Sequence, residues 1–344
     1  MRTYKPHTTF AMAVRERGGQ RGAALVLALS MLVLFGILGT CYLRYMNLTV
    51  VEGDMELRRV RAEQLAAAGI QVAVEALRQE VLQANRYVDR GVTREFSFNT
   101  YGAISHGDEG VSGEAIPGNP RLAIAGVTIH DESGRVNINH APAEVLQRLM
   151  GIDAATARKI AEYAAPGGQG QPFLSLDELV TRNLLSQSQY DALNLSNFTV
   201  FSAPGSQPGA GYFNVNEASP AVLAAVLGLS EEQATRVKSA AGDGFTSLAA
   251  FGQAVASVTG APATSVEGNS SLGLVSRCFR VVSEGRYAKL LDEGAYQAAA
   301  PNERGRYLSN SASGRVEAVV LFGDDGTYEI LHWRRGRGDA GGDA

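Results

Sequence analysis

The chain of 344 residues is long enough for two domains and a substantial core, and its 45% hydrophobic and 19% charged content is ordinary for a globular protein. Its formal net charge is −4; the first 22 residues contribute +4, so the remaining residues sum to −8. Because a nucleic-acid-binding protein normally carries a basic surplus that neutralises phosphates, this charge argues against that class.

An uncharged run of 21 residues, 23–43, follows the basic N-terminal segment. A helix needs roughly 20 residues to cross the hydrocarbon core of a membrane, and the positive-inside rule places the basic segment in the cytoplasm. The chain then continues without proline to about residue 85, and Ile70, Val74, Leu77 and Val81 recur at helical spacing. We therefore expect one continuous helix with a transmembrane part at 23–43 and a periplasmic, amphipathic part at 44–90.

This N-terminus resembles that of a type IV prepilin, with a basic leader that ends in Gly22 and an apolar helix that begins at Ala23. The resemblance implies cleavage between Gly22 and Ala23 by a prepilin peptidase, a methylated new N-terminus, and stacking of subunits through their N-terminal helices. Most pilins carry Glu at the fifth mature position, where this chain has Leu27. Because a lone buried carboxylate is costly without a partner charge, a subunit that lacks it is expected at the tip. The apolar run alone is also compatible with a plain signal anchor.

Strand signals lie on both sides of a helical region. Residues 91–120 are rich in Gly, Ser and other polar residues and are predicted to form a surface loop. The Asp325-Gly326 pair is a strong signal for a hairpin between the last two strands. Alternation and β-branched content predict strands at 121–130, 278–282, 316–322 and 328–333.

The predicted organisation is therefore a sheet interrupted by a helical block. We expect the leader at 1–22, the N-terminal helix at 23–43 and 44–90, a pilin-type α/β domain at 91–133 and 274–336, an inserted helical domain at 134–273, and a disordered tail at 337–344.

Two segments of the helical block repeat one pattern at an offset of 77: GRVNINHAPAEVLQRLMGI at 134–152 and GYFNVNEASPAVLAAVLGL at 211–229. The repeat units, about 134–180 and 211–255, each predict a helix, a Gly turn and a second helix. This resembles the helix-hairpin-helix module of DNA-binding proteins.

Hairpins that grip DNA usually have Gly-hydrophobic-Gly turns, so that bare backbone N–H groups approach a phosphate. Here Asp153 and Ser230 stand at the start of the second helices. Asn137 and Asn214 are interpreted as turn or cap residues, which makes the repeat structural. Capping boxes are predicted at 175–178 and 230–233, and Ser219-Pro220 predicts a helix start.

The complete layout is similar to the GspK family, the minor pseudopilins of type II secretion. The motifs are AALVLALSMLVLFGIL, AEQLAAAGI, DESGRVNINHAPAEVL, FNVNEASPAVLAAVLGL, and SRCFRVVSEG followed by EAVVLFGDDGTYEILHW. The resemblance implies an α+β fold in which a long N-terminal helix precedes a pilin-type antiparallel sheet, with a large inserted all-α domain that contains the two helix-hairpin-helix-like repeats.

The same resemblance implies a function and a set of partners. The chain is expected at the tip of the pseudopilus, anchored by one pass in the bacterial inner membrane with its C-terminal bulk in the periplasm. It would prime assembly and support protein export across the outer membrane. Its partners would be minor pseudopilins of the I and J type, the major pseudopilin and the prepilin peptidase, with no nucleic acid. Ile70, Val74, Leu77 and Val81 are expected to pack against the partner pseudopilins.

Calcium is the cofactor that the resemblance implies, because family members hold it near the sheet. Acidic loops at 106–109, 292–293 and 324–325 offer hard oxygen ligands, but none has a standard ligand spacing, so no ligand is assigned. His130-Asp131-Glu132 with His140 matches no zinc spacing.

No catalytic signature is present, since G-x-S-x-G, Walker A, C-x-x-C and H-E-x-x-H are all missing from the sequence. We therefore expect a non-enzymatic protein. Two alternatives stay open: a membrane-anchored DNA receptor of the competence type, and a minor pilin of a type IV pilus.

Overall fold

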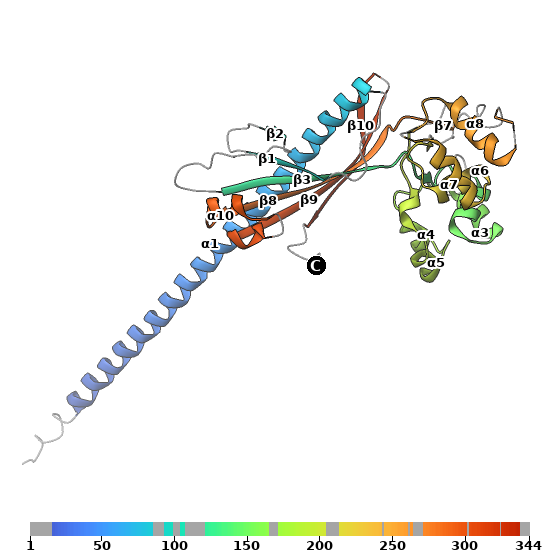
Figure 1. The fold of residues 1–344 in the computed structure, drawn as a ribbon. Helices are drawn as coiled ribbons and strands as arrows, with labels where there is room; N and C mark the ends of the chain where they lie inside the picture. The colour runs from blue at the N-terminus through green and yellow to red at the C-terminus, as the bar shows by residue number, and fades with distance from the viewer. Residues whose placement is uncertain are drawn as a thin grey trace, which may run out of the picture. The chain divides into compact units, whose positions relative to one another are not determined.

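The computed structural model describes residues 16–84, 93–98, 104–106, 121–164, 171–203, 213–242, 244–260, 262–263, 271–300, 303–323 and 325–337. These residues form a long helix, an antiparallel sheet and a block of short helices (Figure 1), so the predicted α+β class is confirmed. The chain divides into two compact units, Met1–Arg58 and Arg59–Ala344.

Helix α1 (Glu16–Ala84) starts upstream of the predicted first helical residue, and the last residues of the predicted helical part, 85–90, lie outside the described residues. Its part Ala24–Gln79 is long and apolar enough to cross a membrane, by length and composition. Among the described residues this is the one helix that meets that test, and it lies where the N-terminal sequence predicts an apolar helix.

The sheet has six antiparallel strands in the order β10-β9-β8-β3-β1-β2. The predicted strands are present, but β8 and β9 are much longer than predicted because they pair along almost their whole length, polar and glycine positions included. The strands are β1 (Thr93–Phe98), β2 (Ile104–His106), β3 (Arg121–Asp131), β8 (Cys278–Leu290), β9 (Leu308–Phe322) and β10 (Tyr328–Arg337).

Part of the predicted loop at 91–120 is wrong, because β1 and β2 lie within it. Strand β1 pairs with β3 from Thr93 opposite Thr128 to Ser97 opposite Ile124. The long-range pairing with β3 stabilises a six-residue segment whose Gly- and Ser-rich surroundings hide any strand signal. A local pattern cannot report that kind of stabilisation.

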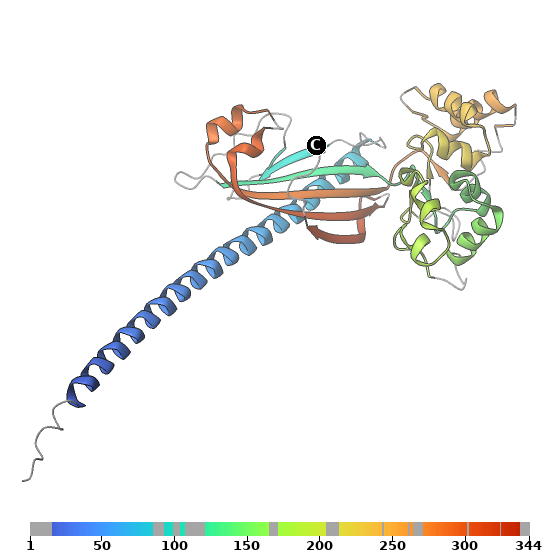
Figure 2. The same ribbon diagram turned by 90° about the horizontal axis from the view of Figure 1, so that it is seen from below.

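The C-terminal part of α1 packs on one face of this sheet (Figure 2). Ile70, Val74 and Leu77 are only 1–2% exposed and share a core with buried side chains of the sheet. These partners lie on β3, β8 and β9: Val127, Ile129, Phe279, Val281, Val316, Ala318, Val320 and Phe322.

Two glycines let α1 approach the sheet closely. Gly285 of β8 and Gly314 of β9 are directly paired. A Cβ at Gly285 would stand 2.5 Å from the backbone nitrogen of Ala66, and one at Gly314 would stand 2.6 Å from that of Glu63. Such distances exclude any side chain at these two positions while α1 keeps its place.

The helical block contains seven short α-helices among the described residues: α2 (Ala143–Met150), α3 (Ala154–Ala164), α4 (Glu178–Thr181), α5 (Gln187–Asp191), α6 (Pro220–Leu227), α7 (Glu231–Ala240) and α8 (Leu248–Thr259). The chain also forms η1 (Leu195–Asn197) inside the block, and α10 (Glu293–Ala298) and η2 (Arg304–Tyr307) between β8 and β9.

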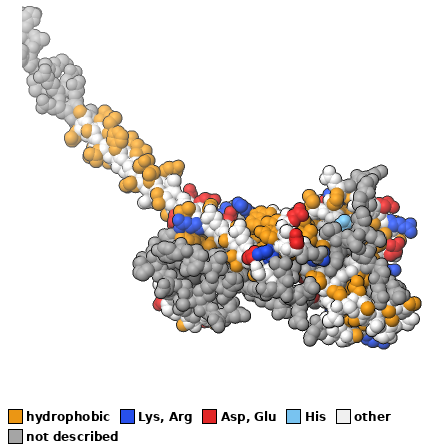
Figure 3. All heavy atoms as spheres, turned by 90° about the horizontal axis from the view of Figure 1, so that it is seen from above, with side chains coloured by type: hydrophobic (Ala, Val, Ile, Leu, Met, Phe, Trp, Pro, Cys, Tyr) orange, Lys and Arg blue, Asp and Glu red, His pale blue; other side chains and the backbone are white. Residues whose placement is uncertain are grey.

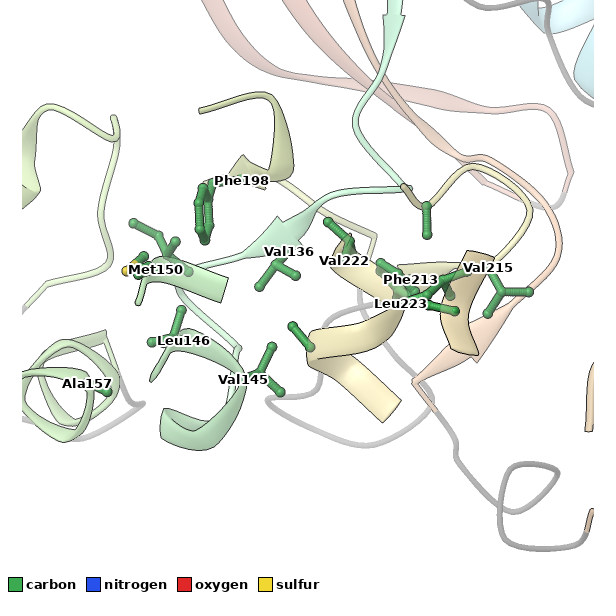
Figure 4. Close-up of a cluster of buried hydrophobic side chains, with 14 of the residues drawn as sticks. Val136, Val145, Leu146, Met150, Ala157, Phe198, Phe213, Val215, Val222 and Leu223 are labelled. Carbon is green, nitrogen blue, oxygen red and sulfur yellow. The ribbon is translucent and has the colours of Figure 1, made fainter. Parts of the chain in front are cut away.

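In each repeat a glycine ends the first helix shortly before the second helix begins. Gly151 and Gly228 end α2 and α6 in the left-handed conformation, with φ of 64° and 69°. The two units share one core (Figure 4), and the guanidinium of Arg148 on α2 donates to the carbonyl oxygen of Ala225 on α6 at 2.9 Å. The side chains labelled in Figure 4 come from both units: Val136, Val145, Leu146, Met150, Ala157 and Phe198 from the first, and Phe213, Val215, Val222 and Leu223 from the second.

Two pairs of short parallel strands, which the sequence does not predict, close the repeats. Strand β4 (Val136–Asn137) pairs with β5 (Phe198–Thr199), and β6 (Phe213–Asn214) pairs with β7 (Leu272–Gly273). Two-residue strands have no periodicity that a sequence pattern can reveal.

The asparagines of the first repeat hold its two short strands together. Asn137 accepts a hydrogen bond from the backbone of Asn139 at 2.9 Å and donates to the hydroxyl of Ser202 at 2.8 Å. Asn139 accepts from the backbone N–H of Phe173 at 2.7 Å and donates to the carbonyl oxygens of Phe173 and Val200.

The second repeat has the same bonds. Asn214 accepts from the backbone of Asn216 at 3.0 Å and donates to the hydroxyl of Ser276 at 2.7 Å. Asn216 accepts from the N–H of Phe245 at 2.7 Å and donates to the carbonyl oxygens of Phe245 and Leu274. The prediction of turn residues at 137 and 214 is confirmed, and the repeat extends to the return segments that the asparagines bind.

The predicted caps are partly correct. Ser230 forms the full capping box with Gln233, and Ser219 caps α6 with Pro220 in its first turn. At 175–178 only half of the box forms: the Glu178 carboxylate accepts from the N–H of Ser175, while α4 begins only at Glu178 itself.

A hydrogen-bond network joins the sheet to the second repeat. The carboxylate of Asp131, at the end of β3, accepts from the hydroxyl of Ser276, which in turn accepts from Asn214. The carbonyl of Ser133 accepts from the N–H of Asn214 at 2.7 Å, and its hydroxyl accepts from the N–H of Cys278. Burial raises the pKa of Asp131 to about 6.

A buried ion-pair cluster lies next to this network. Glu132 is fully buried, and its Oε1 accepts from Arg280 at 2.7 Å and from Arg135 at 3.1 Å. Arg280 also binds Glu317 of β9 at 2.6 Å. Asp131 and Glu132, two of the residues considered above as metal ligands, therefore connect the sheet to the helical block.

Candidate functional site

The most unusual surface of the described chain is the N-terminal half of α1, where large apolar side chains stay exposed over many turns (Figure 3). A soluble surface rarely exposes so large a contiguous apolar patch, and such patches mark membrane or protein contacts. The exposed set is Leu25, Val26, Leu27, Leu29, Met31, Leu32, Val33, Leu34, Phe35, Ile37, Leu38, Tyr42, Leu43, Tyr45, Met46, Leu48, Val50, Val51, Met55, Leu57 and Val60.

One face of this segment has the spacing of a helix-packing seam. Apolar residues or glycines recur at alternating intervals of four and three residues, the repeat that brings one side of a helix against a partner helix. We call this set the seam: Leu25, Leu29, Leu32, Gly36, Gly39, Leu43, Met46, Val50, Gly53, Leu57 and Val60. Every charged residue between 24 and 60 lies off the seam.

Three of the seam positions are glycines inside the helix, at Gly36, Gly39 and Gly53. A glycine there costs about 1 kcal/mol of helix stability relative to alanine. Apart from the adjoining residues of α1 itself, no atom of the described residues lies within 4 Å of a Cβ placed on any of them, so the packing of the described chain does not require them. Small residues on a helix face allow another helix backbone to come close.

The positions implied by the prepilin resemblance all lie on α1. Leu27 is exposed inside the uncharged segment, two positions from Leu25 and Leu29 of the seam. Gly22 and Ala23 belong to the same helix, and their side chains lie outside the described set. Cleavage between Gly22 and Ala23 stays a prediction.

The interpretation of Ile70, Val74 and Leu77 as contacts for partner pseudopilins is wrong for this structure. All three side chains are buried against β3, β8 and β9 of their own chain. Helical periodicity correctly indicates that this face of α1 is covered, but it cannot say by what. The side chain of Val81 lies outside the described residues.

The sequence pattern does not reveal the seam within residues 23–43, because nearly every position there is apolar. Past the run, the signal is visible: Met46, Val50, Leu57 and Val60 keep the four-three spacing among charged residues. The seam thus extends well beyond the part of the helix that a membrane needs.

The helix-hairpin turns of the block offer no open anion site among the described residues. Asp153 accepts from the N–H groups of Ala155 and Thr156 at 2.9 and 3.0 Å and from the Thr156 hydroxyl. These bonds, that from the Thr156 side chain first, lower the pKa of Asp153. Ser230 likewise accepts from the N–H of Gln233 at 3.2 Å. The groups that would hold a phosphate are already bound within the chain.

The acidic loops have local roles where the structure describes them. Asp292 caps α10 through the N–H of Ala295, and Asp325 accepts from the backbone and hydroxyl of Thr327 in the hairpin turn. The described residues hold no group of three or more His, Cys, Asp or Glu side chains that could bind a metal ion. Calcium binding stays a prediction, since the loop at 106–109, apart from His106, and Asp324 lie outside the described residues.

No protein-family model and no curated protein sequence matches the chain. Among solved structures it is similar to a chain in the crystal structure of the GspK-GspI-GspJ complex from the enterotoxigenic Escherichia coli type 2 secretion system. The match covers 83% of this chain and 100% of that chain, with a TM-score of 0.54 and 12% sequence identity. Because α1 and the sheet account for well under 83% of the chain, the match extends into the helical block. The chain therefore has the α+β fold of a protein in that secretion complex.

Proposed function

We propose that the chain is a minor pseudopilin at the tip of a type II secretion pseudopilus. It primes assembly of the pseudopilus together with minor pseudopilins of the I and J type, above the major pseudopilin, and so supports protein export across the outer membrane. It acts by assembly rather than by catalysis. The fold supports this proposal, since a chain in the GspK-GspI-GspJ complex is similar to it over most of its length.

The observation that carries the proposal is the length of the exposed seam. Roughly 20 residues span the hydrocarbon core, so a span at 23–43 leaves Met46, Val50, Leu57 and Val60 beyond the bilayer. Each such side chain gains about 1.5–3 kcal/mol when it passes from water into an apolar contact. A partner helix along the seam supplies that contact and explains the glycine at position 53.

Leu27 supports the proposed position at the tip. In an assembly of stacked helices, a carboxylate at this place needs a partner charge from the next subunit. Leu27 needs none, and it fits a subunit with no neighbour above it. The +4 charge of the first 22 residues supports a cytoplasmic leader and a periplasmic C-terminal part, with the inner membrane between them.

A DNA-receptor role has no support. The helix starts at Asp153 and Ser230 are capped within the chain, and the residues after position 22 carry a net charge of −8. A type IV pilus subunit would share the N-terminal helix, but the solved structure that covers the helical block as well belongs to type II secretion.

The test is co-purification of the full-length chain with the I- and J-type pseudopilins from detergent-solubilised inner membranes. Val50→Asp places a charge on the seam, while Val51→Asp places the same charge on the next residue, about 100° around the helix. Both residues are exposed in the free chain, at 67% and 55%, so neither change disturbs the fold.

We expect Val50→Asp to abolish co-purification and Val51→Asp to retain most of it. Equal recovery of both variants with their partners would refute the seam as the contact. The recovered wild-type chain should begin at Ala23, as N-terminal sequencing would show; a start at Met1 would refute the prepilin assignment.

A further inference from the structure

Strand β10 forms one edge of the sheet (Figure 1), and no described strand pairs with its outer side. It is ten residues long, so it presents a row of backbone N–H and C=O groups that can pair with another extended chain. Its inner side pairs with β9 from Tyr328 to Arg337, with a bulge between Ile330 and His332.

Large apolar side chains of β10 continue the face on which α1 packs. Tyr328 lies opposite Phe322, Ile330 opposite Val320, and Trp333 opposite Ala318, and all three β9 residues belong to the core under α1. The rings of Tyr328 and Phe322 lie with their centroids 6.0 Å apart.

Unlike the buried β9 residues, these β10 side chains are only partly covered. Tyr328 is 49% exposed, Ile330 45% and Trp333 37%. The sheet is therefore wider than the part that α1 buries, and one strand width of apolar surface stays open beside a free edge.

The same strand is basic at its C-terminal end. Arg334 and Arg335 are exposed, adjacent residues that point to opposite faces of the sheet, and neither forms an ion pair among the described residues. By contrast, Glu317, which lies opposite Arg334 on β9, is bound to Arg280.

We propose that the outer edge of β10 is a docking site for an extended, acidic segment of a partner protein, which joins the sheet as an additional strand. Main-chain hydrogen bonds would provide the pairing, and alternate side chains the selectivity. A strand that carries apolar residues opposite Ile330 and Trp333 and carboxylates opposite Arg334 and Arg335 matches the edge on both faces.

Charge selects this occupant over a second copy of the chain. If two β10 strands paired antiparallel along their whole length, Arg334 and Arg335 of each would lie opposite Leu331 and Ile330 of the other, so the opposite-charge pairs that stabilise a strand pair would be missing. A bulge and charged side chains are also the usual protection of an edge against pairing with its own kind. That protection does not act against a segment of opposite charge.

Trp333 is the only tryptophan in the chain, so intrinsic fluorescence reports directly on this edge. The probe is the acetylated, amidated peptide Thr-Glu-Asp-Val-Thr-Val-Lys-Val, titrated into the full-length chain in detergent micelles. One control peptide has Lys in place of Glu and Asp. A second control has N-methyl groups on the amides that would face β10, which removes their hydrogen-bond donors without changing charge.

We expect a blue shift of the Trp333 emission with the acidic peptide, and none with either control peptide. Arg334→Glu with Arg335→Glu should weaken apparent affinity about tenfold or more, because two cross-strand charge pairs become repulsive. Arg236→Glu, a reversal on exposed α7, should leave the affinity unchanged.

Three results would overturn the proposal. The absence of a shift at millimolar acidic peptide excludes this occupant, and equal binding of the N-methylated peptide excludes strand addition. A blue shift that grows with protein concentration in the absence of peptide, together with a dimer in sedimentation, would assign the edge to a second copy instead.

Discussion

Substitution of Gly285 by alanine tests how α1 is held on the sheet. The new Cβ would stand 2.5 Å from the Ala66 nitrogen, and still closer to the carbonyl oxygen of Ala62. Since both neighbours are backbone atoms, α1 must move by about 1 Å to restore ordinary contact. Overpacking of this kind costs about 1–3 kcal/mol, and a gap of 0.5–1 Å forfeits a quarter to a half of the dispersion energy of the contacts that it opens.

The contacts at risk include Ile70, Val74 and Leu77, each worth about 1.5–3 kcal/mol when buried. Together the two effects give an expected loss of about 3 kcal/mol or more, which corresponds to a fall in Tm of about 6–12 °C for a domain of this size. Thermal unfolding of the full-length chain in detergent, followed by circular dichroism and by Trp333 fluorescence, measures it.

Gly126→Ala on β3 is the matched control, because a Cβ there has no atom within 4 Å. Its effect should be neutral or stabilising by up to about 1 kcal/mol, since alanine restricts the unfolded chain. If Gly285→Ala unfolds at the same temperature as Gly126→Ala, α1 does not depend on the close approach, and the reasoning fails.

Two further predictions concern the helical block and its connection to the sheet. Asn139→Ala and Asn216→Ala should each lower the free energy of unfolding by about 2–3 kcal/mol, because each removes three hydrogen bonds to a return segment. If thermal unfolding shows a loss below about 1 kcal/mol at either site, the two repeats are not equivalent. Burial raises the pKa of Asp131 to about 6, above its unfolded value of about 3.9. The free energy of unfolding that the protonated Asp131 contributes is therefore fully present below a pH of about 4 and is lost as the pH rises through about 6. Asp131→Asn should therefore flatten the dependence of Tm on pH in this window, and an unchanged slope would show that another group titrates there.

Local patterns in the sequence predict those elements whose stabilising contacts are local. The four-residue turn signals around Gly151, Gly228 and Ser230 are correct, because a cap or a left-handed glycine acts within one helical turn. The sequence predicts a turn at Asn137 and Asn214 but no role for Asn139 and Asn216, because the bonds of these two to Phe173 and Phe245 join residues 34 and 29 positions apart.

Patterns that report burial do not identify what covers the buried face. The spacing of Ile70, Val74 and Leu77 indicates a covered face, and the sheet of the same chain covers that face. The exposed seam has the same kind of signal, yet no part of the described chain covers it. Only the three-dimensional structure, which shows which apolar positions are left over after folding, separates an internal core from a surface for a partner.

The end of the seam and the start of the core under the sheet lie two residues apart. Val60, the last seam position, is exposed, while Ala62 is fully buried, and both belong to the unit Arg59–Ala344. Two residues on an α-helix differ by about 200° in direction, so these positions look to nearly opposite sides. Gly285 admits the helix at Ala62 and Ala66, and the neighbouring Arg61 donates to the hydroxyl of Tyr287 on β8 at 2.8 Å. At this point of α1 the side that carries Val60 is therefore open, while the side that carries Ala62 packs on the sheet.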